Sequence, residues 1–214
     1  MLVEEIMKTN IHLLRPDQTV KEAVLLFEEK HIRHAPIVED GKLVGVLSDR
    51  DLKDALPSRF ATSPPPERYE KKIESIMTKN PVTAHPMDFV EEIALVFYEQ
   101  QIGCLPVISG EKLVGFLTET DLLYKYIELT GAHQPGSQIE IKVPNRSGVL
   151  YEVSKVFYEK HINVLSVLVY PDKQNSSNKV LVFRVQTMNP LAVINDLRKE
   201  GFDVLWPNIP KTNQ

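Results

Sequence analysis

The sequence is poor in cysteine, and this scarcity excludes several kinds of site. One cysteine, Cys104, stands among 214 residues, so an intrachain disulfide and a multi-cysteine zinc or iron–sulfur centre are both excluded. Six histidines are scattered singly, without the regular spacing of metal ligands, and no metal site is predicted. A single thiol suits a reducing compartment, and we expect the protein to be cytoplasmic.

A basic excess and long apolar runs are also missing. Lysine and arginine number 25 against 29 acidic residues, which gives a formal net charge of −4. That balance lacks the surplus that neutralises phosphate backbones, so general binding to nucleic acid or to an acidic membrane is disfavoured. No apolar run approaches the roughly 20 residues that span a bilayer. Glu4 and Glu5 stand where a signal peptide needs basic residues. We therefore expect neither a nucleic acid nor a membrane as partner.

The chain does contain an internal duplication. Residues 6–52 recur at 76–122 with a constant offset of 70 and no gap, and 18 of the 47 aligned positions are identical. The identities include turn positions, such as Pro36 and its equivalent Pro106, which a shared hydrophobic period alone does not produce. Two similar units in one chain typically pack about a pseudo-two-fold axis, and function is then expected in the paired clefts between them.

Each repeat is predicted to run strand, helix, hairpin, helix. In the first repeat, Thr19 and Glu22 form a capping box that opens the first helix. The dipeptide Asp40-Gly41 suits the positive backbone angles of a tight hairpin turn, and Ser109-Gly110 is predicted to turn the second hairpin.

Composition marks the boundaries of the repeats. Residues 57–72 contain Pro57 and the run Pro64-Pro65-Pro66, and consecutive prolines favour an extended chain. We predict a linker there, between repeats at residues 1–56 and 73–130. The same prolines leave open the alternative of a proline-rich ligand for a recognition domain.

Residues 137–210 form a third predicted unit with the order βαββαβ, the split arrangement of a ferredoxin-like sandwich. Strands are predicted at 139–143, 164–170, 179–185 and 202–206, and helices at 148–160 and 190–201. The predicted fold class is mixed α+β and α/β, with two β-α-β-β-α repeats packed about a pseudo-two-fold axis and the sandwich after them.

Each hairpin ends in the same motif, Gly-x-x-Ser/Thr-x-x-Asp, which contains Ser48 and Asp51 in the first repeat and Thr118 and Asp121 in the second. A hydroxyl three residues before a carboxylate is a capping box, and such boxes are common in proteins that bind nothing. The functional alternative uses the same geometry. A helix N-terminus offers free amides and a positive dipole end to a phosphate, while a nearby carboxylate accepts both hydroxyls of a ribose.

The motifs carry a resemblance to a known family. Together with Ala35-Pro36 and Leu105-Pro106 before the hairpins and an Ile-Met pair near each start, they make residues 1–130 resemble a tandem pair of CBS domains, the Bateman module. The resemblance implies that an adenine nucleotide such as AMP, ADP or ATP binds in the interdomain clefts as a regulatory ligand, with no cofactor required. It also implies that the motif aspartate meets the ribose and the hydroxyl residue lies near the phosphate.

The two clefts are predicted to differ. CBS modules that bind phosphorylated adenosine often carry basic residues before the apolar-Pro step, and here the first repeat has Arg33 and His34 where the second has Gly103 and Cys104. Guanidinium is the better partner for phosphate, which favours the first cleft. The alternative for Arg33 and His34 is a solvated corner, and Cys104 is interpreted as a core-facing residue rather than a redox sensor. The nucleotide-binding residues predicted are Ser48, Asp51, Arg33 and His34, with Val82 at the adenine edge, and Thr118, Asp121 and His12 for a weaker second site.

The third unit resembles an ACT domain, a module that often binds amino acids. The residues that carry the resemblance and are predicted to bind an amino acid are Asn145, Gly148 and Asn163. Gly148 lets backbone approach a ligand, and the two asparagines match effector-binding positions of serine-sensing members. Val143 departs from the histidine of those members, and dimer contact and turn formation are the alternative roles.

Two CBS units followed by one ACT unit resemble the acetoin-utilisation family of Gram-positive bacteria. We predict a non-catalytic sensor in acetoin or acetate catabolism, because no nucleophile elbow, phosphate-binding loop or metal spacing accompanies the motifs. The expected partners are an adenine nucleotide, a second copy of the chain in a homodimer, and a protein of acetoin or acetyl-CoA metabolism. The alternative is a ligand-independent adaptor that docks a metabolic enzyme or transcription factor.

Overall fold

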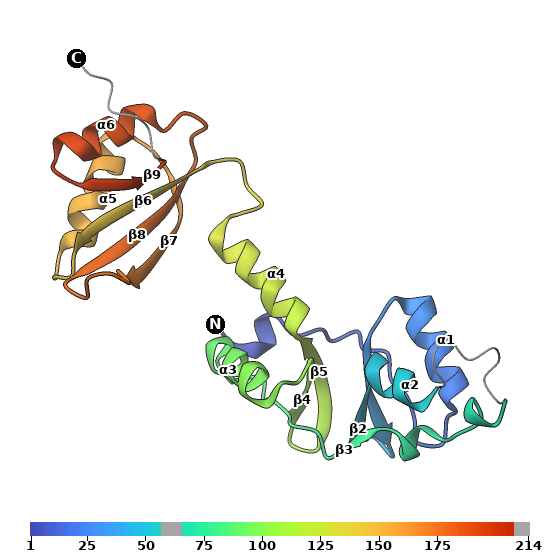
Figure 1. The fold of residues 1–214 in the computed structure, drawn as a ribbon. Helices are drawn as coiled ribbons and strands as arrows, with labels where there is room; N and C mark the ends of the chain where they lie inside the picture. Colours follow the sequence, from blue (N-terminus) through green and yellow to red (C-terminus); the bar gives the residue numbers. More distant parts are fainter. Residues whose placement is uncertain (57–65, 208–214) are drawn as a thin grey trace. The chain divides into compact units, whose positions relative to one another are not determined.

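The computed structural model describes residues 1–56 and 66–207, and these form two compact units, Met1–Leu123 and Tyr124–Gln214 (Figure 1). The division falls within helix α4 (Glu119–Thr130). The predicted proline linker begins at Pro57, and its residues 57–65 lie outside the described residues. No helix in the described part of the chain is long and apolar enough to cross a membrane.

The elements of both repeats are a helix, a two-stranded hairpin and a second helix, and a two-residue strand precedes those of the second repeat. In order they are α1 (Val20–Lys30), β1 (His34–Glu39), β2 (Lys42–Ser48) and α2 (Asp49–Ala55), then β3 (Thr78–Lys79), α3 (Val90–Gln100), β4 (Cys104–Ser109), β5 (Lys112–Thr118) and α4. Helices α1 and α3 both end at a non-glycine residue in the left-handed conformation, His31 with φ 52° and Gln101 with φ 54°.

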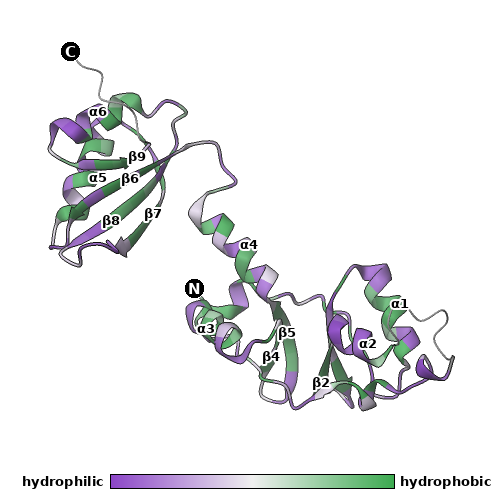
Figure 2. Cartoon of the chain, in the orientation of Figure 1, coloured by the Kyte–Doolittle hydropathy of each residue, from purple (hydrophilic) through white to green (hydrophobic). Residues whose placement is uncertain are grey.

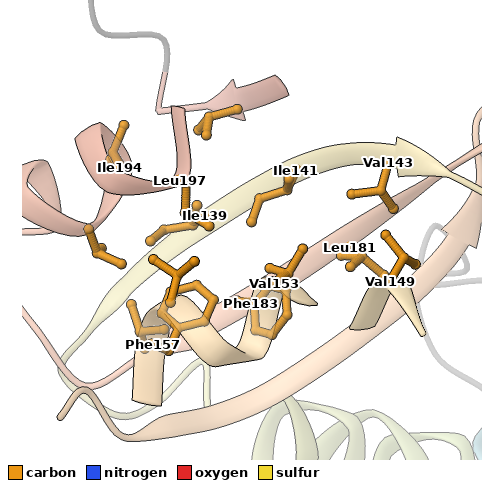
Figure 3. Close-up of a cluster of buried hydrophobic side chains, with 14 residues drawn as sticks. Ile139, Ile141, Val143, Val149, Val153, Phe157, Leu181, Phe183, Ile194 and Leu197 are labelled. Carbon is orange, nitrogen blue, oxygen red and sulfur yellow. The ribbon is translucent and has the colours of Figure 1, made fainter. Parts of the chain in front are cut away.

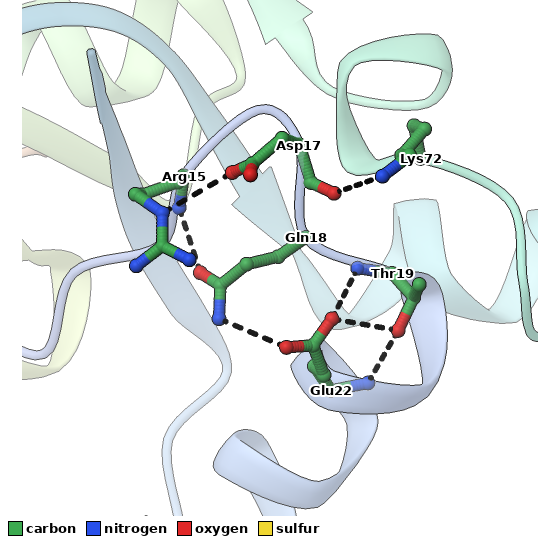
Figure 4. A network of polar contacts seen from close by, with 6 residues as sticks. All are labelled: Arg15, Asp17, Gln18, Thr19, Glu22 and Lys72. Carbon is green, nitrogen blue, oxygen red and sulfur yellow. Dashed lines mark hydrogen bonds and ion pairs between the residues drawn. The ribbon is translucent and has the colours of Figure 1, made fainter.

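The start of α1 shows why the helix forms where the sequence predicts it (Figure 4). The backbone N–H of Thr19 donates to Glu22 Oε2 at 2.7 Å, and the Glu22 N–H donates to Thr19 Oγ1 at 3.3 Å. This reciprocal pair satisfies amides that have no partner within the helix, and the predicted capping box is confirmed. Lys72, at the described end of the predicted linker, donates from Nζ to the Asp17 carbonyl at 2.6 Å, so this end of the linker is held against the first repeat.

The strands form one sheet with the order β1-β2-β5-β4, and β3 pairs with β2. Strands β2 and β5 pair antiparallel at Lys42 and Lys112, which are equivalent residues of the two repeats. An antiparallel pairing of a residue with its own equivalent is what a two-fold axis requires, and the predicted pseudo-symmetry is confirmed. The first hairpin turns at Asp40 and Gly41, both with positive φ, as expected. The second turns at Gly110 and Glu111, one residue later than predicted.

The first segment of each repeat crosses to the other repeat. Val3, in the short helix η1 (Val3–Glu5), is fully buried in the hydrophobic cluster of the second repeat, and Ile73, in η3 (Ile73–Ser75), is fully buried in that of the first. Lys8 exchanges two backbone hydrogen bonds of 2.9 Å with Phe116 of β5. The predicted leading strand is therefore reduced to this bridge in the first repeat and to the two residues of β3 in the second.

The crossing explains the glycine that opens each motif. A Cβ at Gly115 would meet the side chain of Met7, and a Cβ at Gly45 would lie 2.8 Å from Met77 Sδ and 2.9 Å from the Thr78 carbonyl oxygen. Both methionines belong to the crossing segments, so glycine gives them room over the hairpin.

The second unit is the predicted sandwich, and the fold class is confirmed. Its elements are β6 (Ser137–Pro144), α5 (Val149–Glu159), β7 (Val164–Pro171), β8 (Asn178–Val185), α6 (Leu191–Lys199) and β9 (Asp203–Trp206). The sheet order is β7-β8-β6-β9. Alternate residues of β6, such as Ile139 and Ile141, are fully buried with Phe157 and Phe183, whose ring centroids lie 4.7 Å apart (Figure 3). Figure 2 shows the corresponding pattern, with β8 mostly hydrophobic and α6 of mixed character.

Gly115→Ala tests the crossing. We expect it to lower the free energy of unfolding by about 1–3 kcal/mol, because the added methyl group overpacks against Met7. Urea denaturation of Gly115→Ala, Met7→Ala and the double variant measures the coupling. The double variant should be more stable than the sum of the single losses predicts.

Gly45→Ala is the matched control. Met77→Ala should rescue it only in part, because the Thr78 carbonyl oxygen also blocks the added methyl group. Strictly additive losses for the pair Met7 and Gly115 would contradict the proposed contact.

Candidate functional site

Both motif aspartates cap their own helices. Asp51 Oδ2 accepts from the Ser48 N–H at 2.7 Å and from Ser48 Oγ at 2.6 Å, and the Asp51 N–H donates to Ser48 Oγ at 3.2 Å. Thr118 and Asp121 form the same three bonds at 2.9, 2.6 and 3.4 Å. The capping interpretation is therefore confirmed in both repeats, and it occupies only one oxygen of each carboxylate.

The second carboxylate oxygen distinguishes the two repeats. Asp121 Oδ1 lies 2.7 Å from the Lys8 ammonium, whereas no described residue pairs with Asp51 Oδ1. The residue equivalent to Lys8 in the other repeat is Thr78, which carries no charge. Of the two motif aspartates, Asp51 is thus the one whose second oxygen has no partner among residues 1–56 and 66–207.

A cavity of about 680 Å³ lies beside Ser48, within the 300–1,000 Å³ range typical of ligand sites. It brings together all five residues predicted for the first site, which are Ser48, Asp51, Arg33, His34 and Val82. Its walls come from both repeats, since Gly103 and Cys104 of the second repeat face the motif of the first. We call it the Ser48 cavity.

A second cavity, of about 420 Å³, lies beside Thr118, and we call it the Thr118 cavity. It contains Thr118 and His12 of the predicted second site, but Asp121 is not on its wall. Two basic residues that the sequence analysis missed, Lys8 and His31, do line it. The signal for Lys8 was available, because aligning the repeats sets this cation against the neutral Thr78.

Arg33 and His34 line both cavities, together with Gly103 and Glu119. The two basic residues predicted for the first cleft therefore border the second cavity as well. His34 begins β1, which pairs with β2, and the two cavities share the wall at this end of the strand. Their position therefore allows the side chains of Arg33 and His34 to contact a ligand in either cavity.

His34 packs against Gly103, the residue of the second repeat that is equivalent to Arg33. A Cβ at Gly103 would lie 2.8 Å from His34 Nε2, so the imidazole occupies space that a larger residue would take. Burial lowers the pKa of His34 from its ordinary value, with Arg33 also lowering it and Asp49 opposing. The ring is neutral at pH 7, and Arg33 supplies the positive charge of the shared wall.

Cys104 is buried, with 8% of its surface exposed. Burial, and after it the charge of Asp51, raise the pKa of the Cys104 thiol to about 12. The thiolate is the reactive form of cysteine, so this residue is inert at neutral pH and the interpretation as a core-facing residue is confirmed.

The predicted amino-acid-binding residues do not meet within one chain. Asn145 follows Pro144, which pairs with Asn178 at the start of β8, and Asn163 precedes Val164, which pairs with Val185 at its end. The eight residues of β8 separate the two asparagines by roughly 23 Å. They are far apart because α5 returns the chain to the far end of the sheet before β7 begins.

Two members of that predicted set, Gly148 and Asn163, have local roles in the fold. Gly148 caps α5 with φ 80°. The Asn163 amide donates to Gln186 Oε1 at 3.1 Å. Beside Gly148, Arg146 forms a bidentate pair with Glu152 at 2.7 Å for both contacts, which the sequence analysis missed.

The family assignment rests on the whole duplicated region. The CBS domain model matches residues 3–58 and 73–128, and the ACT domain model matches residues 137–202. The chain belongs to the CBS-domain family and carries an ACT domain. A CBS domain-containing protein of Dictyostelium discoideum is 33% identical over 143 residues, covering 64% of this chain and 99% of that protein. A homoserine O-acetyltransferase of Methanococcus vannielii is 33% identical over 114 residues, covering 53% of this chain but 22% of the enzyme.

Solved CBS structures resemble the duplicated region. A crystal structure described as an acetoin utilization protein, AcuB, from Vibrio cholerae is 31% identical with a TM-score of 0.54, covering 63% of this chain and 96% of that one. The CBS pair of protein MJ0100, in complex with 5′-methylthioadenosine and S-adenosyl-L-methionine, is 28% identical with a TM-score of 0.52, covering 63% and 98%. CBSX2 in complex with AMP is 25% identical with a TM-score of 0.51, covering 59% and 96%.

The Cys104 thiol provides a direct test of burial in this CBS pair. We expect iodoacetamide to label it at pH 8 at least on the order of a hundredfold more slowly in the native protein than in denaturant, because the native thiol stays protonated. Mass spectrometry of the time course measures the rate. A Cys104→Ser, Lys155→Cys protein, whose thiol lies on an exposed position of α5, is the control and should react equally fast in both states. Rapid native labelling of Cys104 would contradict its burial.

Proposed function

We propose that the CBS pair is a non-catalytic regulatory sensor that binds an adenine nucleotide of the AMP, ADP or ATP type. The Ser48 cavity carries the proposal, because it gathers the five predicted residues around an aspartate with one unoccupied carboxylate oxygen. The related CBS structures in complex with AMP, 5′-methylthioadenosine and S-adenosyl-L-methionine support an adenosine ligand.

The arrangement of the Ser48 cavity suggests how each part of the nucleotide is bound. Asp51 Oδ1 accepts from the ribose hydroxyls while Oδ2 keeps the helix cap, so binding does not break the motif. Arg33 binds the phosphate beside Ser48, whose hydroxyl hydrogen stays with Asp51 Oδ2, and the backbone near Val82 meets the adenine edge. The Thr118 cavity, with Thr118 and His12 and with Asp121 behind it, is the second and weaker nucleotide site.

Ligand binding acts on the relative orientation of the repeats. Among the described residues the two hairpins pair directly only at Lys42 and Lys112, beside the exposed Lys42–Glu111 ion pair, and the crossing segments supply the other connections between the repeats. A nucleotide that touches Ser48 on one repeat and Gly103 on the other adds contacts between the repeats. Its binding energy shifts the population towards one orientation of the repeats.

The ACT domain provides a second signal, and a homodimer is proposed as the working state in the cytoplasm. Asn145 and Asn163 lie at opposite ends of β8, so an amino-acid site with both requires two chains. Helix α4 has no buried residue and exposes Tyr124, Tyr126 and Leu129, a surface that self-association would cover. The likeness to AcuB supports a role in acetoin or acetate catabolism, with a protein of that metabolism as partner.

Calorimetry with Asp51→Ala and Asp121→Ala tests the first site. Asp51→Ala should weaken AMP binding by at least about tenfold, because the ribose loses a charged acceptor, whereas Asp121→Ala should spare it. Asp51→Asn, which keeps a carbonyl oxygen for the cap, separates loss of the ligand from loss of the helix start. Equal losses of AMP affinity in both alanine variants would contradict the predicted difference between the two sites. No binding of AMP, ADP, ATP or cyclic di-AMP to the wild type would overturn the proposed function.

The oligomeric state is checked separately by light scattering. We expect about twice the 24.4 kDa of one chain, because association covers the exposed side chains of α4. Tyr126→Glu should shift the mass towards one chain. A wild-type mass of a single chain would contradict the homodimer.

The adaptor remains the second candidate, because both capping boxes are complete without any ligand. Capture of a partner from cell extract separates the two functions. Capture that AMP does not change favours the adaptor, and capture that AMP alters favours the sensor.

A further inference from the structure

The two cavities differ in the charges on their walls. The Thr118 cavity has Lys8 and Arg33 with one carboxylate, Glu119, among the described residues that line it. The Ser48 cavity has Arg33 and Arg50 with three carboxylates, Asp49, Asp51 and Glu119. His12 and His31 add to the Thr118 cavity groups that become positive on protonation, and His34 is common to both. A polyanion is therefore favoured at Thr118 and opposed at Ser48.

Both cavities have two lysine or arginine side chains, so the difference in charge comes from Asp49 and Asp51 on the wall of the Ser48 cavity. Lys8 is the cation that lines the Thr118 cavity and not the Ser48 cavity. Its backbone is fixed by two hydrogen bonds to Phe116, so the crossing segment places it at the cavity wall. Its ammonium lies 2.7 Å from Asp121 Oδ1, where the carboxylate is 14% exposed and the lysine side chain 62% exposed. The ion pair removes the second oxygen of Asp121 from use by a ribose. The exposed ammonium retains donors for a further anion.

Each added phosphate consequently has opposite effects in the two cavities. In the Thr118 cavity the added phosphate gains contacts with Lys8 and Arg33, which both line this cavity. In the Ser48 cavity it approaches Asp49 and Asp51, and a like charge at contact distance is unfavourable. Asp49 is ionised at neutral pH, because the hydrogen bond from Lys53 lowers the pKa of its carboxyl group.

We propose that Lys8 makes the Thr118 cavity a polyphosphate site, while the Ser48 cavity takes an adenosine ligand with one phosphate or none. The adenosine part of this statement rests on the proposed function above, whereas the polyphosphate part rests on the walls of the Thr118 cavity alone. The ligand class of the Thr118 cavity is a nucleoside di- or triphosphate, bound chiefly through its phosphates.

The duplication itself supplies the test, as a reciprocal exchange of equivalent residues. Lys8→Thr gives the second repeat the residue of the first, and Thr78→Lys does the reverse. Calorimetry of the full chain with adenosine, AMP, ATP and inorganic tripolyphosphate measures both cavities. Lys8→Thr should weaken ATP and tripolyphosphate binding in the Thr118 cavity by on the order of tenfold and leave adenosine binding in the Ser48 cavity, which Lys8 does not line, unchanged.

Thr78→Lys should have the complementary effect. The new ammonium pairs with Asp51 Oδ1 as Lys8 pairs with Asp121, so adenosine and AMP should bind at least about fivefold more weakly. Lys155→Thr, which removes the same charge from an exposed helix position of the second unit, is the matched control and should change neither ligand. Urea midpoints of all three variants confirm that they are folded.

The outcomes separate this inference from the proposed function. Unchanged tripolyphosphate binding by Lys8→Thr, or no tripolyphosphate binding by the wild type, overturns the charge assignment even where AMP still binds. If adenosine and AMP fail to bind but tripolyphosphate binds in a Lys8-dependent way, the proposed function is lost and the polyphosphate site stands. A steeper salt dependence for tripolyphosphate in the wild type than in Lys8→Thr further supports the contact.

Discussion

The exchange of first segments between the two repeats is the constraint on which the first unit depends. Val3 completes the hydrophobic cluster of the second repeat, and Ile73 completes that of the first. Neither repeat closes its core with its own leading residues. The exchange also fixes the positions of Lys8 and Thr78, because each follows a buried segment and pairs with the other repeat's hairpin, at Phe116 and Val46 respectively. The segments that close the two cores therefore also supply residues to the walls of the cavities.

The motif serves the fold and leaves part of its chemistry free. One oxygen of Asp51 and one of Asp121 hold the helix start, which is a local requirement met in both repeats. Whether the other oxygen has a partner depends on the crossing segment, which places an ammonium beside Asp121 and a neutral residue at the equivalent position of the other repeat. Duplicated sites can therefore keep the same motif and acquire different ligand preferences.

Local determinants made most of the fold predictable. The Thr19 cap, the Asp40-Gly41 turn and the alternation of β6 all depend on residues that are close in the sequence, and the structure has them as predicted. The five residues predicted for the first site line one cavity, and four of them do so because the motif and the basic pair lie at the ends of adjacent paired strands. The separation of Asn145 and Asn163 was not predictable in this way, because the two residues flank a helix that carries the chain from one end of the sheet to the other.

By itself the sequence determined that the chain is duplicated, where its helices and strands lie, and which motif is present in both repeats. These follow from periodicity, capping and identity at a fixed offset, which act over a few residues or by direct comparison. Only the tertiary structure decided that the leading segments cross, that Arg33 and His34 border both cavities, and that Lys8 takes the free oxygen of Asp121. The physical reason is that such contacts join residues far apart in the chain, and the local sequence around one residue does not indicate which distant residue it contacts.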